Sequence, residues 1–64
     1  MNVKSKFLRV YANLPLSARK EIVIVINQEP LTWNSARIEI ENETKIGKEI
    51  LEKLVKMKII KIDE

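Results

Sequence analysis

Few side chains in this 64-residue chain are of the types that carry out catalysis, because the sequence contains no Cys and no His. This composition excludes cysteine nucleophiles, Ser-His-Asp triads, and zinc sites built from thiolates or imidazoles. Ser5, Ser17 and Ser35 therefore have no imidazole base, and a chain whose one glycine is Gly47 cannot form a glycine-rich phosphate loop. Carboxylates, lysines and one tyrosine remain, and we expect neither catalysis nor a cofactor.

Three glutamates with alternate spacing, Glu39, Glu41 and Glu43, form the cluster that most resembles a metal site. Carboxylate oxygens suit a hard cation such as Mg²⁺. Side chains at i, i+2 and i+4 converge on a strand, where alternate residues share a face, and diverge on a helix. Nothing else in the sequence supports a metal there, so we predict none.

Charge is distributed unevenly along the chain. Residues 1–20 contain five basic side chains and no acidic one, whereas residues 21–43 contain five Glu and a single Arg. A cationic helix could bind the phosphates of a nucleic acid and release their counterions. The same pattern would also allow the basic end to complement the acidic middle, within the fold or across a dimer. The candidate nucleic-acid-binding residues are Lys4, Lys6, Arg9, Arg19 and Lys20.

The length of the chain allows one domain, residues 1–64, which would bury about 60% of the surface that the unfolded chain exposes. Its hydrophobic content of 45% is typical of a globular protein. The abundance of Ile, Lys and Glu, with one Gln, resembles a heat-adapted composition. The longest apolar run, Ile22–Ile26, is far shorter than the roughly 20 residues that span a membrane, and no signal-peptide pattern follows Met1. We therefore expect a soluble, cytoplasmic protein without a membrane partner.

Apolar side chains recur with helical spacing at the start of the chain and predict a helix over residues 3–14, closed by Pro15. Ile22–Ile26 is β-branched at every position, which predicts a strand, and its lack of alternation predicts cover on both faces. A turn at residues 27–30 and a short returning strand over residues 31–33 complete a hairpin. The helical stripe consists of Val3, Phe7, Val10, Tyr11 and Leu14.

Residues 34–43 fit two patterns. Ala36, Ile38 and Ile40 alternate with charged residues as on a strand, and this template fits the periodicity better. On a helix, Trp33, Ala36 and Ile40 share one face. We favour the helix, because it can follow a tight hairpin directly, whereas the strand would need a nine-residue loop. The sequence alone leaves both alternatives open.

A C-terminal helix is predicted to begin after Thr44, which is a suitable N-cap. Gly47 in its first turn indicates either a close approach of another backbone or an incidental residue. Ile59, Ile60 and Ile62 could continue as a terminal strand or fray. The apolar line of the helix is formed by Ile46, Ile50, Leu54 and Met57.

These elements predict an α+β fold with an N-terminal helix, a β-hairpin, and one or two C-terminal helices packed on the sheet. One helical layer covers one face of a strand that is apolar on both, so the other face needs a second copy of the chain. We therefore predict a small, non-catalytic protein–protein interaction module that forms a homodimer. Nucleic-acid binding by the basic N-terminal helix is the alternative. The predicted dimer interface is Ile22, Val23, Ile24, Val25 and Ile26.

One set of packing and capping residues extends over most of the chain: Phe7-Leu8, Tyr11, Leu14-Pro15, Ile22–Ile26, Pro30, Thr32-Trp33-Asn34, Thr44, Gly47, Ile50-Leu51 and Leu54. With these residues the chain resembles small archaeal proteins of unknown activity. The resemblance implies no activity, cofactor or site, and it favours the helix over residues 34–43.

The segment Ile50–Asp63 resembles the end of a winged-helix recognition helix that runs into the first strand of the wing. Lys58 stands where that family has Gly. In addition, an apolar strand is predicted at the place where the family has a preceding helix. The winged-helix interpretation is therefore less favoured than the other two.

Overall fold

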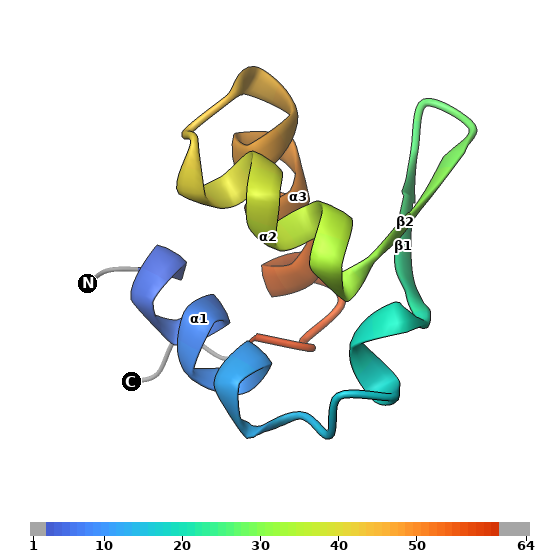
Figure 1. The fold of residues 1–64 in the computed structure, drawn as a ribbon. Coiled ribbons are helices and arrows are strands. Elements are labelled where there is room, and N and C mark those ends of the chain that lie inside the picture. The colour runs from blue at the N-terminus through green and yellow to red at the C-terminus, as the bar shows by residue number, and fades with distance from the viewer. Residues whose placement is uncertain (1–2, 61–64) are drawn as a thin grey trace.

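The computed structural model describes residues 3–60, which fold in the order helix, hairpin, helix, helix (Figure 1). This arrangement confirms the predicted α+β class, with two helices after the hairpin. A short 3₁₀ helix, η1, lies between the first helix and the hairpin. The elements are α1 Val3–Asn13, η1 Ala18–Lys20, β1 Ile22–Ile26, β2 Glu29–Thr32, α2 Trp33–Glu41 and α3 Lys45–Lys56.

β1 and β2 form an antiparallel hairpin closed by Asn27 and Gln28, whose φ angles are 52° and 69°. Positive φ at both positions is the mark of a type I′ turn, which matches the right-handed twist of the strands. The turn is shorter than the predicted 27–30, because β2 already begins at Glu29. Trp33, predicted at the end of the returning strand, is instead the first residue of α2.

The segment that fitted two patterns is a helix, which confirms the favoured interpretation. α2 follows β2 without a loop, and the Thr32 hydroxyl accepts a hydrogen bond of 3.1 Å from the Ser35 amide. This N-cap satisfies a backbone donor that has no partner inside the helix. Ala36 and Ile40 are buried, while Ile38 is 50% exposed. The apparent alternation therefore arises from one isoleucine on the outer side of a helix.

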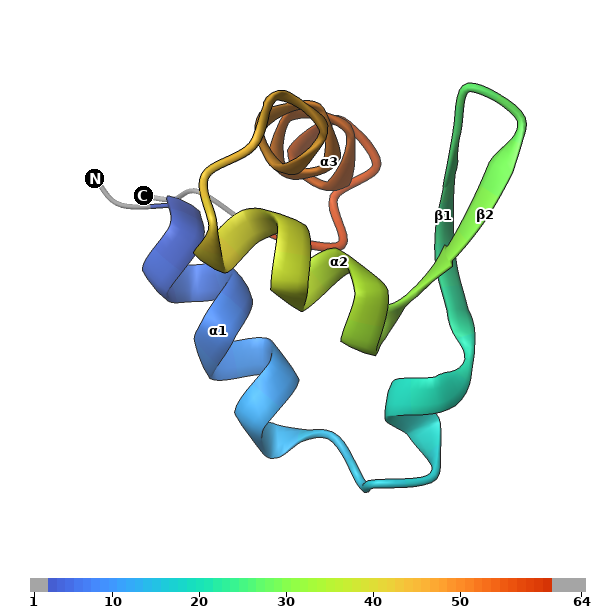
Figure 2. The ribbon, with the colours of Figure 1, turned by 45° about the horizontal axis from the view of Figure 1, so that its top comes forward.

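α3 begins after Thr44, whose hydroxyl accepts a hydrogen bond of 2.9 Å from the Gly47 amide. Residues 42–44 connect it to α2, and Figure 2 shows α3 nearly end-on while α2 runs across the view. In the winged-helix comparison, an apolar strand was expected in the place of the preceding helix, and this detail is wrong, because α2 occupies that place. The apolar run that suggested a strand there belongs to β1, which lies further upstream in the chain.

The chain turns back on itself after α3. Lys58 has a φ angle of 63°, and the amides of Ile59 and Ile60 both bond to the last turn of α3. Residues 57–60 accordingly form a turn and bends, and Ile60 is buried in the core. No terminal strand forms in the described part of the chain, and Ile62 lies outside the described residues.

The three α-helices lie together on one side of the hairpin (Figures 1 and 2). Their inner sides and one face of β1 meet in a single hydrophobic core. Within residues 3–60, no helix is long and apolar enough to cross a membrane. The buried core residues are Phe7, Ile24, Ile26, Ala36, Ile40, Ile50, Leu54 and Ile60.

We expect the substitution Gly47→Ala to destabilise the fold, although the same change stabilises a free helix by about 1 kcal/mol. A Cβ at this position would lie 2.4 Å from the carbonyl oxygen of Glu39 and 2.8 Å from its carbonyl carbon. Relieving such a clash with backbone typically costs about 1–3 kcal/mol. Urea denaturation measures the effect on the free energy of unfolding.

Lys53→Ala, on the exposed side of α3, is the control and should change the free energy of unfolding by less than about 0.5 kcal/mol. A Gly47→Ala variant as stable as the wild type would contradict the close packing of α2 and α3.

Candidate functional site

The helices cover one face of the hairpin and leave the other open. Ile24 and Ile26 lie in the core and are 6% and 3% exposed. Ile22 and Val25 are 60% and 52% exposed, and Val23 is half-buried. Two of the five predicted interface residues are thus part of the chain's own core. Ile22 and Val25 are the two that a partner can readily reach.

A break in the strand register explains why Ile22 lies outside the core. Leu31 and Thr32 are consecutive on β2, yet their partners Ile24 and Ile22 are two residues apart on β1. Val23 is therefore an extra residue in a bulge, which moves Ile22 to the face opposite Ile24. A run of five similar side chains does not reveal such a bulge, so the sequence could not show which of them would be exposed.

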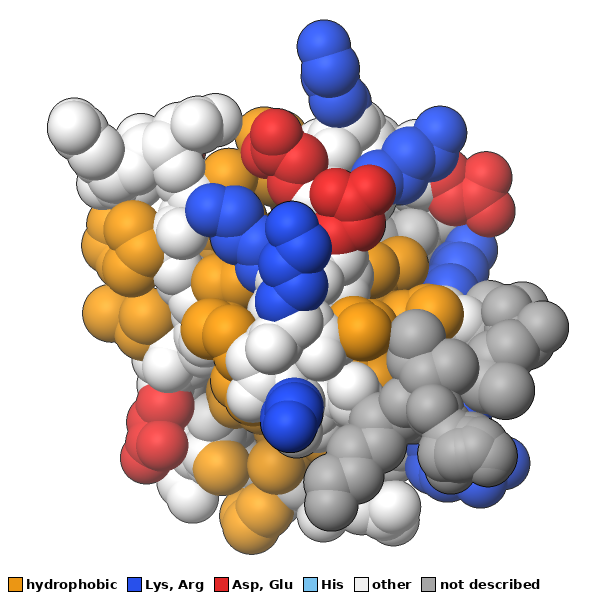
Figure 3. Space-filling model, turned by 180° about the vertical axis from the view of Figure 1, so that it is seen from behind, with side chains coloured by type: hydrophobic (Ala, Val, Ile, Leu, Met, Phe, Trp, Pro, Cys, Tyr) orange, Lys and Arg blue, Asp and Glu red, His pale blue; other side chains and the backbone are white. Residues whose placement is uncertain are grey.

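The outer hairpin face, defined here as Ile22, Val25 and Pro30, is uncharged. Pro30 pairs with Val25 across the hairpin and is exposed. Seen from behind, hydrophobic side chains gather along the hairpin side of the molecule (Figure 3). Leu16, in the connection between α1 and η1, is 74% exposed. Large exposed apolar side chains of this kind often mark a surface that another molecule covers.

Two of the five predicted phosphate-binding residues stabilise the fold. Lys4 Nζ lies 3.0 Å from Glu43 Oε2 and ties α1 to the turn between α2 and α3. Arg19 donates hydrogen bonds from Nε to the Tyr11 carbonyl (3.2 Å) and from Nη2 to the Ala12 carbonyl (3.3 Å). These carbonyls lie in the last turn of α1, where a cation also complements the negative end of the helix dipole.

The other three basic residues, Lys6, Arg9 and Lys20, make no ion pair or side-chain hydrogen bond with any residue in the range 3–60. Arg9 and Lys20 are exposed, and Lys6 is half-buried. The structure thus divides the predicted set into two residues with internal partners and three cations that form no ion pair with the described residues.

A cluster of aromatic and arginine side chains joins α1, η1 and α2. The Tyr11 hydroxyl donates a hydrogen bond of 2.5 Å to Asn34 Oδ1. The guanidinium carbons of Arg19 and Arg37 lie 4.3 Å and 5.3 Å from the centroid of the Tyr11 ring. Each such cation–π contact contributes about 0.5–1 kcal/mol at exposed sites. Sequence reasoning missed this cluster, because its members come from three elements and have no characteristic spacing.

Arg37 is held on the surface of α2 by two neighbours. Its Nη1 lies 2.7 Å from Glu41 Oε1. Hydrogen bonding to Tyr11 and the negative charge of Glu41 raise the pKa of Arg37 above its ordinary value. Its Nε is the one buried side-chain nitrogen or oxygen among the described residues that has no hydrogen-bond partner.

Beside this cluster, Trp33 stacks on Phe7 with 5.7 Å between ring centroids, which gives the tryptophan a packing role.

The three glutamates considered as cation ligands have separate partners. Glu39 accepts a hydrogen bond of 2.6 Å from Thr44 Oγ1, Glu41 pairs with an arginine, and Glu43 pairs with a lysine. On a helix, side chains two residues apart do not face each other. In the part of the chain that the structure describes, no three potential ligands gather in a group.

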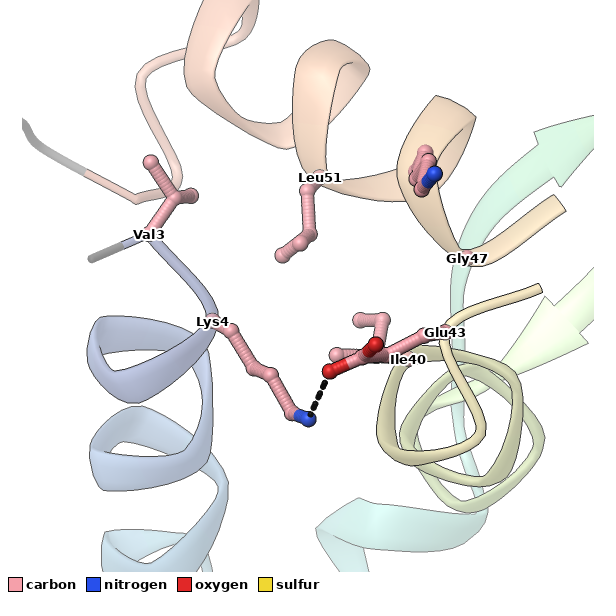
Figure 4. Close-up of a pocket in the computed structure, with 7 residues that line it drawn as sticks. Val3, Lys4, Ile40, Glu43, Gly47 and Leu51 are labelled. Carbon is pink, nitrogen blue, oxygen red and sulfur yellow. Dashed lines mark hydrogen bonds and ion pairs between the residues drawn. The ribbon is translucent and has the colours of Figure 1, made fainter. Parts of the chain in front are cut away.

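Two open depressions lie between α1 and α3 and share Val3 and Leu51. The larger measures about 550 Å³ and the smaller about 450 Å³. In the larger one, Lys4 and Glu43 form their ion pair beside the apolar side chains of Val3, Ile40 and Leu51 (Figure 4). A ligand pocket needs polar groups that converge on the ligand. Here Lys4 and Glu43 satisfy each other, and a third charged residue, Lys48, also lines the depression.

The chain matches no family model, no curated protein and no solved structure. The resemblances to small archaeal proteins and to winged helices therefore stay predictions.

We expect the substitution Lys4→Met to raise the pKa of Glu43. In the wild type, the hydrogen bond from Lys4 and its positive charge lower the pKa of Glu43, and Lys48 adds to this effect. The ion pair therefore stabilises the fold above the pKa of an unfolded glutamate, and this contribution is lost as the pH falls through the lowered pKa. An NMR titration of the carboxylates measures the change.

Lys6→Met is the matched control, because it removes a lysine of the same helix that lies outside the pair. It should leave the pKa of Glu43 unchanged. If the pKa of Glu43 were the same in the wild type and in Lys4→Met, the contact between α1 and the α2–α3 turn would not exist in solution.

Proposed function

We propose that the chain is a small, non-catalytic protein–protein interaction module that self-associates as a homodimer through the open side of its hairpin. The observation that carries this proposal is the exposure of Ile22 and Val25 on the same strand that supplies Ile24 and Ile26 to the core. A strand with apolar residues on both sides is most stable when both sides are covered. The helices of a single chain cover only the side with Ile24 and Ile26.

Dimerisation would improve the stability of the hairpin as well as cover it. A two-stranded hairpin is marginally stable by itself, and small domains commonly add stability by oligomerisation. Burial of apolar surface contributes about 25 cal/mol per Å². In an isologous dimer, the same residues of β1 meet across a two-fold axis. Because β1 contains no charged residue, this meeting brings no like charges together.

A non-catalytic role agrees with the chemistry that the chain offers. The sequence lacks Cys and His, and the carboxylates of Glu39, Glu41 and Glu43 are occupied by partners within the fold. Among the described residues that line the larger depression, Glu43 is the one carboxylate, and it is paired with Lys4, so the depression offers no free acid beside a base. These observations support a binding role over an enzymatic one.

We expect sedimentation analysis to give twice the chain mass of 7.5 kDa at high micromolar concentration. The double variant Ile22→Lys/Val25→Lys should be a folded monomer, because charges on the open side of the hairpin oppose pairing. Ile38→Lys is the matched control, since it places a lysine on an isoleucine of α2 that is similarly exposed, at 50%. This control should remain dimeric. A wild-type chain that stays monomeric throughout the concentration range would contradict the proposal.

Nucleic-acid binding is the second candidate function, and two observations favour it. Lys6, Arg9 and Lys20 have no carboxylate partner among residues 3–60. In addition, α3 crosses α2 after a connection of three residues, 42–44, as in helix-turn-helix proteins (Figure 2). Against it, the exposed side of α3 carries Glu52 as well as lysines, and glutamates repel phosphates. The hairpin also precedes α2, whereas a wing follows the recognition helix.

We expect the triple variant Lys6→Gln/Arg9→Gln/Lys20→Gln to bind a labelled DNA duplex much more weakly than the wild type at about 50 mM salt, where electrostatic binding is strong. Each lost phosphate contact should also reduce the slope of log affinity against log salt by about 0.9. Fluorescence anisotropy measures both. Lys53→Gln, an exposed lysine of α3, is the control. Absence of wild-type binding at low salt, or unchanged binding by the triple variant, would eliminate this candidate.

A further inference from the structure

The two depressions between α1 and α3 are continuous, because they share Val3 and Leu51. Together they are called here the α1–α3 groove. Among the described residues, none from the hairpin lines this groove. Its α3 side spans about 12 Å of the helix axis, at 1.5 Å per residue. The α3 residues that line it come from successive turns and are Gly47, Lys48, Leu51, Glu52, Val55 and Lys56.

The apolar lining of the groove is only partly covered by the chain itself. Val3, Leu51 and Val55 pack against the core and remain half-buried. In Figure 4, the Val3 and Leu51 side chains flank the larger depression, which Ile40 also lines. Half-buried aliphatic side chains in an open groove gain stability when another apolar surface covers them.

The α3 side of the groove carries three charges that have no internal partner. Lys48, Glu52 and Lys56 follow each other at intervals of four residues, so they form one row along the helix. None of them forms an ion pair or a side-chain hydrogen bond with another residue in the range 3–60. By contrast, Lys4 and Glu43 elsewhere in the lining pair with each other. The groove therefore combines an apolar lining with an unpaired positive, negative, positive row.

We propose that the α1–α3 groove binds an amphipathic helix of a partner protein. The apolar stripe of this helix covers Val3, Leu51 and Val55, and its flank carries Glu, Lys and Glu one turn apart. A helix fits because the groove lies between two helices and one side of it is a row with four-residue spacing, as in the packing of helical ridges into grooves. The inference goes beyond the proposed self-association and does not depend on it.

Charge complementarity defines the partner. A flank of Glu, Lys and Glu places an opposite charge against each of Lys48, Glu52 and Lys56. A second copy that used its own α3 in this register would instead place Glu52 against Glu52 and lysine against lysine. Because the row reads the same in both directions, charge does not select the direction of the bound helix.

Other classes of ligand match the groove less well. An added strand needs a sheet edge, whereas the described lining belongs to helices and to the α2–α3 turn. A nucleic acid would meet the carboxylates of Glu43 and Glu52, which repel phosphates. A small molecule needs polar groups that converge on it, whereas Lys48 and Lys56 are about 12 Å apart along the helix axis.

Two synthetic peptides of about 18 residues, long enough to form a helix, test the inference. Both have a leucine stripe, and their flanks carry either Glu, Lys and Glu (the matched peptide) or Lys, Glu and Lys (the reversed peptide) at four-residue spacing. In NMR titrations, the matched peptide should shift the methyl signals of Leu51 and Val55 and leave those of Ile22 and Val25 unchanged. The reversed peptide should bind about tenfold more weakly, because three attractive pairs become repulsive.

The charge-swap variant Lys48→Glu/Glu52→Lys/Lys56→Glu should invert this preference and bind the reversed peptide more tightly than the matched one. Circular dichroism checks that the variant is folded. The substitutions change only exposed side chains, so we expect the helix to persist.

The neighbouring row of α3 supplies a matched control. Lys45, Glu49 and Lys53 have the same charges and the same spacing, and they do not line the groove. The variant Lys45→Glu/Glu49→Lys/Lys53→Glu should therefore keep the wild-type preference for the matched peptide.

Three results would overturn the inference. The first is the absence of methyl shifts at Leu51 and Val55 with about 1 mM matched peptide, which is a concentration that reveals even weak binding. The second is an unchanged peptide preference in the folded charge-swap variant. The third is a shift of these methyl signals with protein concentration alone, which would assign the groove to a second copy. Self-association through Ile22 and Val25 is measured separately by sedimentation, so it can fail or succeed independently.

Discussion

The contact between the backbones of α2 and α3 at Gly47 is the constraint on which the rest of the core depends. Without a side chain there, α3 lies against the last turn of α2, where a Cβ would come within 2.4 Å of the Glu39 carbonyl oxygen. The two helices form a corner whose inner sides include Ile40 and Ile50, both fully or almost fully buried. The inner face of β1, with Ile24, completes this core. The position of the hairpin thus follows from a close approach of two helices.

The same corner leaves one side of the hairpin open, and the functional proposal follows from this geometry. A bulge at Val23 moves Ile22 to the open side, next to Val25, while their neighbours fill the core. Both strands of the hairpin are interrupted, β2 by Pro30 and β1 by the bulge at Val23. β1 therefore combines a buried side, with Ile24 and Ile26, and an exposed apolar side, with Ile22 and Val25. The helices that stabilise the domain and the strand that would join two domains are parts of one packing arrangement.

The basic residues show how far sequence reasoning about a site can extend. The sequence identified five cations in the first 20 residues, and it could not tell which of them would have internal partners. Arg19 caps α1 and lies over Tyr11 because the connection through η1 brings it back to the end of that helix. Lys4 meets Glu43, which is 39 residues away along the chain. Contacts of this kind depend on distances that close only in the folded chain, so a count of charges overestimates the cationic surface.

The sequence by itself determined the α+β class, the N-terminal helix, the hairpin and the N-cap of α3, because these features follow from local spacing, β-branching and capping. It also excluded chemistry based on Cys or His. Tertiary structure alone decided that Ile38 faces outward on a helix, that Val23 forms a bulge, and that residues 57–60 turn inward instead of forming a strand. It also assembled the cluster around Tyr11. Local patterns set the conformation of each segment, whereas the side of a segment that becomes buried depends on which other segments pack against it.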